Sequence, residues 1–324
     1  MGQSWTEADI PDLSGRTVLL TGGNAGLGLQ AATVLAGRGA RVILACRRPE
    51  RAERAVRQVN AASAGVGAGA GGEASSVRLD LASQASVREA AAEIGERFGL
   101  IDVLINNAGV MDIPLQRTED GFEMTLATNH FGPFALTGLL LPRLASGARI
   151  VTVSSLSHLN GVVDFDDLNW ERHYNSAKAY GRSKLANLLF TYELDRRLRA
   201  AGAQVSALAC HPGIVYTDLF VTQSRAQKVF MSPSMRIVNF WAIQDVRMGA
   251  LPTLRAATDP SAQGGEFYGP RGQGLRRKFF TGFPAVVESN ARSHDAADQA
   301  RLWQASEQLT GVDYALGSSA TPLG

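Results

Sequence analysis

The fold is decided by the stretch Thr17-Val18-Leu19-Leu20-Thr21-Gly22-Gly23-Asn24-Ala25-Gly26-Leu27-Gly28. Aliphatic and β-branched residues run into a glycine-rich turn, and apolar residues then recur at helical spacing, at Leu29, Ala32, Val34 and Leu35. This order predicts a strand, a tight turn and a helix, the opening of a nucleotide-binding βαβ unit. The glycines would let the backbone approach a pyrophosphate, and the helix N-terminus would offer free N–H groups. A tight turn that binds nothing is the alternative interpretation.

The composition is that of an ordinary globular protein. The chain has 324 residues, of which 45% are apolar and 19% charged, enough for one large α/β domain or two small ones. A formal net charge of +2 is too close to zero to indicate a nucleic-acid partner.

The cysteines and the hydropathy pattern point to the cytoplasm. Cys46 and Cys210 are too few for a disulfide framework, and each ends an apolar run, so we expect buried free thiols. We see no N-terminal signal segment and no apolar run of membrane length. These features predict a soluble, cytoplasmic protein without a membrane span.

Strands and helices alternate along the chain. Strands are predicted near residues 17–20, 41–46, 76–79, 101–105, 149–153, 204–209 and 266–268. Helices are predicted after the glycine turn and near 47–60, 83–98, 119–145, 178–200 and 292–309. This alternation predicts an α/β fold: one doubly wound (Rossmann), mostly parallel sheet with helices on both faces.

We interpret residues 1–324 as a single dinucleotide-binding catalytic domain. Residues 1–15 form a polar lead-in, 61–74 a flexible Ala/Gly loop, and 270–324 a C-terminal extension. Residues 216–250 carry large apolar side chains that could line a pocket or pack a lid, and we assign them as a substrate lid. A polar and aromatic insertion covers 158–176.

Residues suited to ligand binding follow the predicted strands. In open α/β sheets, ligands bind beyond the carboxyl ends of the strands. The residues at these ends are the turn at 22–28, Arg47, Asp80, Asn107, Ser155 and Pro212-Gly213. Their convergence on one edge is harder to obtain by chance than any single motif.

The end of the second strand indicates which nicotinamide cofactor is used. An acidic residue about 20 positions after the glycine turn would bind the ribose 2′-hydroxyl of NAD. Here Cys46 is followed by Arg47 and Arg48, and no acid occurs before Glu50. A guanidinium suits a 2′-phosphate, so NADP(H) is favoured, with Arg47 preferred over Arg48. Two solvated arginines at a helix start are the alternative.

Tyr180 and Lys184 are four residues apart and share one face of a helix. A neighbouring ammonium, together with an oxidised nicotinamide ring, would lower the pKa of the phenol and make it an acid/base group. Tyr174 and Lys178 have the same spacing. We choose the first pair because Tyr180 leads directly into the helical stripe formed by Leu185, Leu188, Leu189 and Tyr192.

Two further polar residues are candidates for the same chemistry. Ser155, at a strand end, could orient a substrate carbonyl, with Ser154 as the alternative and plain turn chemistry as a third reading. Asn129 interrupts an apolar helix and needs a buried partner, so it either kinks the helix or holds a water next to Lys184. The five histidines lack close ligand spacing, so no metal site is predicted.

Together these motifs resemble the short-chain dehydrogenase/reductase family across almost the full chain. The Thr-Gly-x3-Gly-x-Gly motif is matched at 21–28, Asn-Asn-Ala-Gly at 106–109 and Tyr-x3-Lys at 180–184. The resemblance implies a catalytic tetrad of Asn129, Ser155, Tyr180 and Lys184. It implies cofactor contacts at Gly22, Asn24, Ala25, Gly26, Leu27, Gly28, Arg47, Asp80, Leu81, Asn107, Ala108, Gly109, Tyr180, Lys184, Pro212, Gly213, Ile214 and Thr217. In this pattern, the backbone of Ile214 and the hydroxyl of Thr217 hold the carboxamide.

Within the family, the segments at 45–47, 154–158, 183–187 and 211–213 are most similar to the retinol dehydrogenase and WW-domain oxidoreductase branch. That branch implies NADP(H) and lipophilic aldehydes, ketones or alcohols. The membrane anchor usual in its animal enzymes is missing, which argues against retinoids. The gap between Ser155 and Tyr180 exceeds the family's common spacing, although the branch carries a similar insertion.

The resemblance predicts a reductase in which Tyr180 protonates a carbonyl oxygen as hydride arrives at carbon. A catalytically silent NADPH-binding regulator or scaffold is the alternative. A nucleotide-sugar epimerase is disfavoured because it would carry a Gly-x2-Gly-x2-Gly turn. In many family members the helices at 119–145 and 178–200 form the oligomer interface; the insertion and the C-terminal segment could obstruct it, so both monomer and homodimer stay open.

Overall fold

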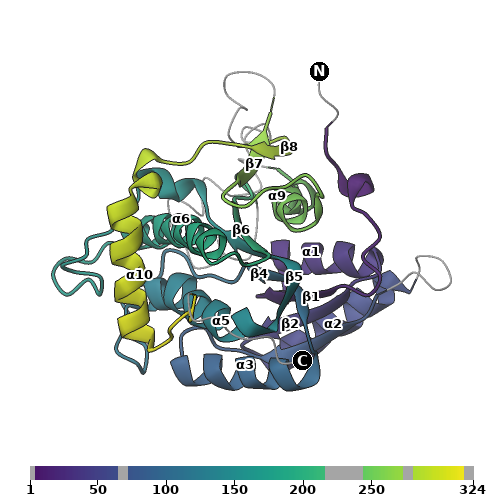
Figure 1. Cartoon of the computed structure of the whole chain (residues 1–324), viewed down its shortest axis with the longest axis horizontal. Coiled ribbons are helices and arrows are strands. Elements are labelled where there is room, and N and C mark those ends of the chain that lie inside the picture. The colour runs from purple at the N-terminus through teal and green to yellow at the C-terminus, as the bar shows by residue number, and fades with distance from the viewer. Residues whose placement is uncertain (1–3, 65–71, 216–243, 273–279, 317–324) are drawn as a thin grey trace, which may run out of the picture.

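A single mixed sheet forms the centre of the molecule (Figure 1). The computed structural model describes residues 4–64, 72–215, 244–272 and 280–316. The sheet has eight strands in the order β3-β2-β1-β4-β5-β6-β7-β8, and neighbours are parallel except β7 and β8. The strands are β1 Thr17–Thr21, β2 Arg41–Cys46, β3 Ala74–Arg78, β4 Ile101–Asn106, β5 Leu144–Val153, β6 Val205–Cys210, β7 Phe267–Arg271 and β8 Phe283–Val286. The strand order reverses between β1 and β4, where such sheets bind ligands.

Helices cover both faces of the sheet (Figure 1). The α-helices are α1 Gly26–Gly37, α2 Pro49–Ser63, α3 Gln84–Arg97, α4 Met124–Leu126, α5 Gly132–Leu140, α6 Ser176–Ala200, α9 Val246–Thr258 and α10 Ala296–Thr310. One apolar cluster joins α1, α2 and α9 to the sheet, and a second joins α3, α5 and α6 to its other face. The doubly wound fold predicted from the sequence is confirmed.

The central strand β1 shows why the sheet lies between two layers. All five of its residues are buried. Side chains alternate across a strand, so Val18 and Leu20 enter the cluster with α1, whereas Leu19 enters the cluster with α5 and α6. A strand that is apolar on both faces must be covered on both faces.

The C-terminal segment adds a third layer outside α5 and α6 (Figure 1). The Trp303 ring of α10 lies 5.2 Å from the Phe134 ring and 4.5 Å from the Tyr314 ring, measured between centroids. The Tyr314 hydroxyl donates a hydrogen bond of 2.6 Å to the Phe134 carbonyl. The chain therefore covers the outer faces of α5 and α6 with its own C-terminal residues.

The long helix predicted over 119–145 is wrong at both ends. The Glu123 carboxylate accepts hydrogen bonds of 2.8 Å from the N–H groups of Thr125 and Leu126, so helix α4 begins only after Glu123. A π-helical turn, Ala127–Phe131, then leads into α5. Pro142 lacks an N–H group and lies in the 3₁₀ turn Leu141–Arg143 that follows α5. Strand β5 starts directly after this turn.

Other boundaries also differ from the predictions. The loop predicted over 61–74 is shorter because α2 runs to Ser63 and β3 starts at Ala74, while 65–71 lie outside the described residues. Most of the predicted lid, 216–243, also lies outside them. The end of the predicted lid overlaps helix α9, which starts at Val246 and buries Ala250 against α1. Strand β8 was not predicted, and the predicted extension starts inside β7.

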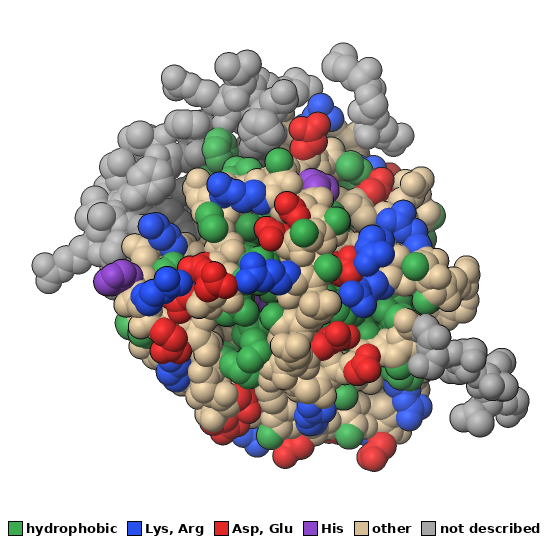
Figure 2. Space-filling model, turned by 60° about the vertical axis from the view of Figure 1, so that its left-hand side comes forward, with side chains coloured by type: hydrophobic (Ala, Val, Ile, Leu, Met, Phe, Trp, Pro, Cys, Tyr) green, Lys and Arg blue, Asp and Glu red, His purple; other side chains and the backbone are tan. Residues whose placement is uncertain are grey.

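The surface in Figure 2 carries charged side chains of both signs among polar and apolar ones. On the face that includes α10, basic and acidic side chains are interspersed (Figure 2). Among the described residues, no helix is both long and apolar enough to cross a bilayer.

The third layer should contribute strongly to stability. Trp303→Ala removes a side chain that is 2% exposed and packed among aromatic rings, so we expect a loss of about 3–5 kcal/mol in unfolding free energy. Leu309→Ala, on the same helix but 40% exposed, should cost less than about 1 kcal/mol. Urea denaturation followed by fluorescence and circular dichroism measures both. Equal losses in the two variants would contradict this packing.

Candidate active site

The glycine turn and the segment after β4 hold each other at the point where the strand order reverses. The Thr21 hydroxyl accepts hydrogen bonds of 3.0 Å from the N–H groups of Asn107 and Ala108. The Asn107 amide donates back to the Thr21 carbonyl at 2.9 Å. Gly22 and Gly26 have φ angles of +71° and +53°, which favour glycine. The two sequence motifs thus form one unit.

This unit fits a dinucleotide pyrophosphate. A Cβ atom at Gly28 would lie 2.6 Å from the Gly22 carbonyl oxygen and 2.7 Å from the Asn107 amide nitrogen, so the helix can approach the turn only as glycine. Helix α1 begins at Gly26, and its N-cap, Ala25, makes no side-chain capping bond. The first N–H groups of α1 are therefore available to an anion. The Leu27 side chain packs on the core shared with α9, so only its backbone could serve a cofactor.

The Cys46 side chain contacts the glycine turn. Its thiol is buried at the end of β2, and burial raises its pKa to about 11. The backbone N–H groups of Gly23 and Asn24 lie close to the sulfur and partly oppose this rise. The thiol is therefore neutral at ordinary pH, and we assign it a packing role.

Arginines surround the end of β2. Arg47 and Arg48 are exposed, and Arg48 occupies the N-cap position of α2, before Pro49, without a side-chain capping bond. A hollow of about 350 Å³ beside the turn is lined by Asn24, Ala25, Arg51, Arg54, Ala55 and Gln58. The sequence reasoning missed Arg51 and Arg54. Their spacing of three residues on a helix that begins at a strand end was the signal that could have found them.

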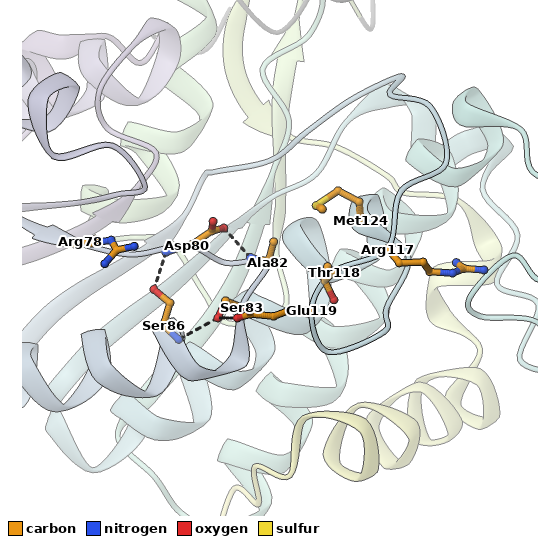
Figure 3. Close-up of a pocket in the computed structure, with 9 residues that line it drawn as sticks. All are labelled: Arg78, Asp80, Ala82, Ser83, Ser86, Arg117, Thr118, Glu119 and Met124. Atoms are coloured by element: carbon orange, nitrogen blue, oxygen red, sulfur yellow. Dashed lines mark hydrogen bonds between the residues drawn. The ribbon is translucent and has the colours of Figure 1, made fainter.

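The end of β3 borders a second hollow, of about 300 Å³ (Figure 3). One oxygen of the Asp80 carboxylate accepts a hydrogen bond of 3.0 Å from the Ala82 N–H group, and the Asp80 N–H group donates to the Ser86 hydroxyl. The Leu81 side chain is buried in the core below α5. Asp80 can thus offer its second oxygen to a ligand, whereas Leu81 can offer only backbone. The lining residues are Arg78, Asp80, Ala82, Ser83, Ser86, Arg117, Thr118, Glu119 and Met124.

Lys184 and Asn129 meet beside Gly109. The Lys184 ammonium donates to the Val153 carbonyl at 2.9 Å, next to the end of β5. A Cβ atom at Gly109 would lie 3.0 Å from Asn129 Oδ1 and 3.6 Å from Lys184 Nζ. The structure therefore brings residues from the β4 end, the π-turn and α6 to one place.

Asn129 is the central residue of the π-turn, and its amide uses both N–H donors and one acceptor position of its oxygen within the protein. Its Oδ1 accepts from the Val110 N–H group at 2.8 Å, and its Nδ2 donates to the Val110 carbonyl and to the Ser183 hydroxyl, each at 2.9 Å. These are the buried partners that a polar residue in an apolar helix requires. The water expected beside Lys184, held by Asn129, stays a prediction.

Ser155, not Ser154, lies next to the Tyr180 phenol. The Ser154 hydroxyl donates to the Lys184 carbonyl at 2.8 Å and is buried against α6. The Ser155 hydroxyl accepts from the Ser157 N–H group at 3.2 Å and opposes the rise in the Tyr180 pKa, which places it beside that phenol. The geometry thus favours Ser155 for contact with a reacting carbonyl.

Burial controls the protonation of Tyr180 and Lys184. It raises the pKa of Tyr180 to about 12 and lowers that of Lys184 to about 8. The Lys184 ammonium lies 5.6 Å from the centroid of the Tyr180 ring. Burial thus opposes the lowering of the phenol pKa expected from Lys184.

The competing pair, Tyr174 and Lys178, does not form a comparable site. The Tyr174 hydroxyl donates to the Ile113 carbonyl at 2.9 Å and so holds the loop that follows β4. Lys178 is exposed near the start of α6. This arrangement gives Tyr174 a structural role.

The loop after β6 is held by hydrogen bonds within the protein. Gly213 has a φ of +71°, and its N–H group donates to the His211 ring at 3.2 Å. The Pro212 carbonyl accepts from Gln244 at 2.6 Å. Both backbone groups of Ile214 are already engaged, with Phe280 at 3.2 Å and with Gln244 at 2.9 Å. The predicted carboxamide contact of the Ile214 backbone stays a prediction. Thr217 lies outside the described residues.

Among the described residues, no cluster of three or more His, Cys, Asp or Glu side chains could hold a metal. At this edge of the sheet, the glycine turn and the N-terminus of α1 form a site suited to an anion. The Tyr180 phenol, the Lys184 ammonium and the Ser155 hydroxyl lie at the same edge. This set can bind a dinucleotide and exchange a proton with a neighbouring oxygen atom.

We expect the buried Lys184 ammonium to lower the stability of the fold at neutral pH. The Lys184 pKa is about 8 in the fold but 10.5 ordinarily, so between these values the unfolded chain holds more protons. The ammonium therefore destabilises the fold below pH 8, and the penalty fades as the pH rises toward 10.5. Lys184→Met should raise the Tm at neutral pH, with a gain that shrinks in alkali.

Lys178→Met, on the exposed start of the same helix, is the matched control and should leave the Tm unchanged. Differential scanning fluorimetry across pH measures both variants. A Tm gain independent of pH, or a loss in Lys184→Met, would show that the ammonium is not held at this cost.

Comparison with known proteins gives the same family throughout. Residues 16–228 match the short chain dehydrogenase family. The chain is 40% identical over 313 residues to retinol dehydrogenase 13 of Homo sapiens, an alignment that covers 95% of this chain and 87% of that protein. It is also 40% identical over 312 residues to retinol dehydrogenase 14 of Homo sapiens, covering 93% and 88%.

Solved structures share the fold. An uncharacterized protein from Mycobacterium Paratuberculosis matches with a TM-score of 0.77 at 40% identity, covering 96% of this chain and 99% of that chain. A short chain dehydrogenase from Burkholderia cenocepacia, solved in complex with NADP, matches with a TM-score of 0.60 at 24% identity, covering 79% and 96%. This chain therefore belongs to the short-chain dehydrogenase/reductase family, as an oxidoreductase related to retinol dehydrogenases over most of its length.

Proposed function

We propose that this protein is an NADP(H)-dependent oxidoreductase that interconverts a lipophilic aldehyde or ketone with the corresponding alcohol. The observation that carries the proposal is the meeting of Tyr180, Ser155 and Lys184 beside the glycine cradle. In that position a buried acid/base group adjoins the space that a nicotinamide ring would occupy.

The chain's own residues supply the proton chemistry of this reaction. The bound cofactor supplies a hydride to the carbonyl carbon in reduction and takes it back in oxidation. Tyr180 holds its proton at neutral pH, because its pKa is about 12, and donates it to the carbonyl oxygen. Ser155 orients that oxygen by a hydrogen bond. The Lys184 ammonium stabilises the phenolate that remains until a proton returns from solvent.

Asn129 has a positioning role in this proposal. Its amide fixes the backbone of Val110, directly after Gly109, and the hydroxyl of Ser183, next to Lys184. It therefore ties the floor of the cofactor site to the helix that carries the acid/base pair. We assign the proton relay beside Lys184 to the π-turn that contains Asn129.

The arginines around β2 support NADP(H). Arg47 is exposed directly after the strand, no acid occurs before Glu50, and Arg51 and Arg54 line the hollow beside Asn24. A 2′-phosphate there would meet several guanidinium groups. The Burkholderia cenocepacia relative is described in complex with NADP, at an identity that speaks for the fold alone.

The relatives support a lipophilic substrate. Retinol dehydrogenases 13 and 14 share about 40% identity with this chain over nearly its full length. Long apolar alcohols and aldehydes of the retinoid type are therefore the first substrates to test. A missing member of the tetrad would support the silent-regulator alternative, and all four residues are present.

We also propose that the protein is a monomer and lies in the cytoplasm. The cover of α10 and Tyr314 over α5 and α6 obstructs the surface that many family members use for assembly, which supports a monomer. Two buried free thiols, Cys46 and Cys210, fit a reducing cytoplasm.

The reaction is tested by NADPH oxidation against lipophilic aldehydes, retinal and bulky cyclic ketones. Tyr180→Phe should lower kcat by about 10²-fold or more, because the proton donor is lost. Tyr174→Phe, which removes the hydroxyl's bonds to the Ile113 carbonyl and the Glu123 carboxylate, should keep most of the activity. Activity that survives Tyr180→Phe but is lost in Tyr174→Phe would overturn the site. Tight NADPH binding without turnover on the whole panel would favour the regulator.

Cofactor choice gives a separate prediction. Arg51→Ala should raise the KM for NADPH by about tenfold, because a charge-assisted contact with the 2′-phosphate is lost, and leave the KM for NADH unchanged. Arg57→Ala, further along α2 and paired with Glu53, is the control. Equal effects on NADPH and NADH would contradict a 2′-phosphate contact, and the same series at Arg47 and Arg48 would rank those two residues.

A further inference from the structure

The carbonyl of Ser155 receives two hydrogen bonds from one residue. His158 follows in the 3₁₀ turn Leu156–Asn160, and its N–H group donates to the Ser155 carbonyl at 3.0 Å. The Nδ1 atom of its ring lies 2.6 Å from the same oxygen. His158 thus holds the backbone of the serine whose hydroxyl lies beside Tyr180.

The partners of the ring fix its tautomer. The backbone N–H group of Asn290 can only donate, and it points at His158 Nε2 at 3.2 Å. Nε2 is therefore the acceptor, and the single ring proton of neutral His158 lies on Nδ1, where it is donated to the Ser155 carbonyl. A doubly protonated ring would face the Asn290 N–H group with a second donor and lose this contact.

Asn290 belongs to a segment, residues 289–294, that lies 132 positions from His158 in the sequence. Its side chain donates to the Leu159 carbonyl at 2.9 Å and to the His158 carbonyl at 3.3 Å. Arg292 in the same segment donates to the Gly161 carbonyl at 3.1 Å. Hydrogen bonds from residues 289–294 therefore hold the turn that follows Ser155.

The His158 ring is enclosed, with 1% of the residue exposed. It lies edge-on to Phe267 of β7, at 5.4 Å between centroids, and His211 packs on the same ring at 5.2 Å. Burial lowers the pKa of His158, against a smaller opposing effect of the Ser155 backbone. The neutral ring required by both hydrogen bonds is thus the favoured form at neutral pH.

We propose that His158 and Asn290 are positioning residues that set the catalytic hydroxyl of Ser155 from the C-terminal segment. The inference rests on the proposed function, because it assigns Ser155 to the reacting carbonyl. Ser155 is extended, with φ −156° and ψ 159°, and a fixed carbonyl restrains the direction of its Cα–Cβ bond, while the Ser157 N–H group holds the hydroxyl itself at 3.2 Å. A displacement of about 1 Å at such a group costs up to about 100-fold in rate.

Four variants test whether His158 and Asn290 position the Ser155 hydroxyl. His158→Phe keeps an aromatic ring and the backbone bond to Ser155 but removes the two hydrogen bonds of the imidazole, to the Ser155 carbonyl and from the Asn290 N–H group. The kcat for carbonyl reduction should therefore fall by about 10- to 100-fold with the KM for NADPH unchanged. His158→Asn can place its Nδ2 near the former Nδ1 and donate to the Ser155 carbonyl, so it should recover most of the loss. Asn290→Ala keeps its backbone donor but loses its side-chain bonds, and should show a smaller fall in kcat.

His294→Phe is the matched control. This histidine lies in the same segment but is exposed and stacked on Tyr192, and its ring contacts the Ser289 hydroxyl. Its replacement should leave kcat unchanged. Full activity in His158→Phe, or no recovery in His158→Asn, would overturn the proposal, since a purely structural loss would not be rescued by the smaller donor.

A second readout does not depend on turnover. Imidazole ¹⁵N NMR of the NADPH complex should show His158, assigned by its absence in His158→Asn, as the neutral Nδ1–H tautomer at neutral pH. An Nε2–H tautomer or a charged ring would overturn the arrangement. If the wild-type protein reduces no carbonyl on the panel, the proposed function fails, and the tautomer alone then decides whether His158 holds Ser155.

Discussion

The bond from the Lys184 ammonium to the Val153 carbonyl is the interaction on which the rest of the site depends. It joins α6 to the end of β5 and places a positive charge inside the protein. The carbonyl also accepts from Asn187 at 3.2 Å, so two donors from successive turns of α6 converge on it. With the helix held there, Tyr180 is placed one turn earlier, and Ser154 anchors the strand end on the Lys184 carbonyl at 2.8 Å.

Hydrogen bonds of similar length join the other segments at this edge of the sheet. Thr21 and Asn107 tie the glycine turn to β4, and Asn129 ties the segment after β4 to α6. The proposed cofactor cradle and the acid/base pair therefore belong to one hydrogen-bonded frame and not to separate loops. A frame of this kind holds reacting groups in place before substrate arrives, which reduces the reorganisation needed in the transition state.

Local patterns were sufficient for much of this account. The apolar strands, the glycine turn and the spacing of Tyr180 and Lys184 act over a few residues, and the sheet order then follows from general rules. The covering position of α10 and the contact between His158 and Asn290 could not be predicted, because they join segments far apart and leave no periodic trace. The helix over 119–145 was overextended because the capping carboxylate of Glu123 was not recognised.

The central claim is that this frame makes Tyr180 an acid/base group once an oxidised nicotinamide adds its charge. Ultraviolet difference titration of phenolate in the NADP⁺ complex, with Tyr180→Phe as reference, tests it most directly. We expect a phenolate that is absent from Tyr180→Phe and titrates well below the value of about 12 set by burial alone. A Tyr180 that stays protonated up to that value in the complex would contradict the claim.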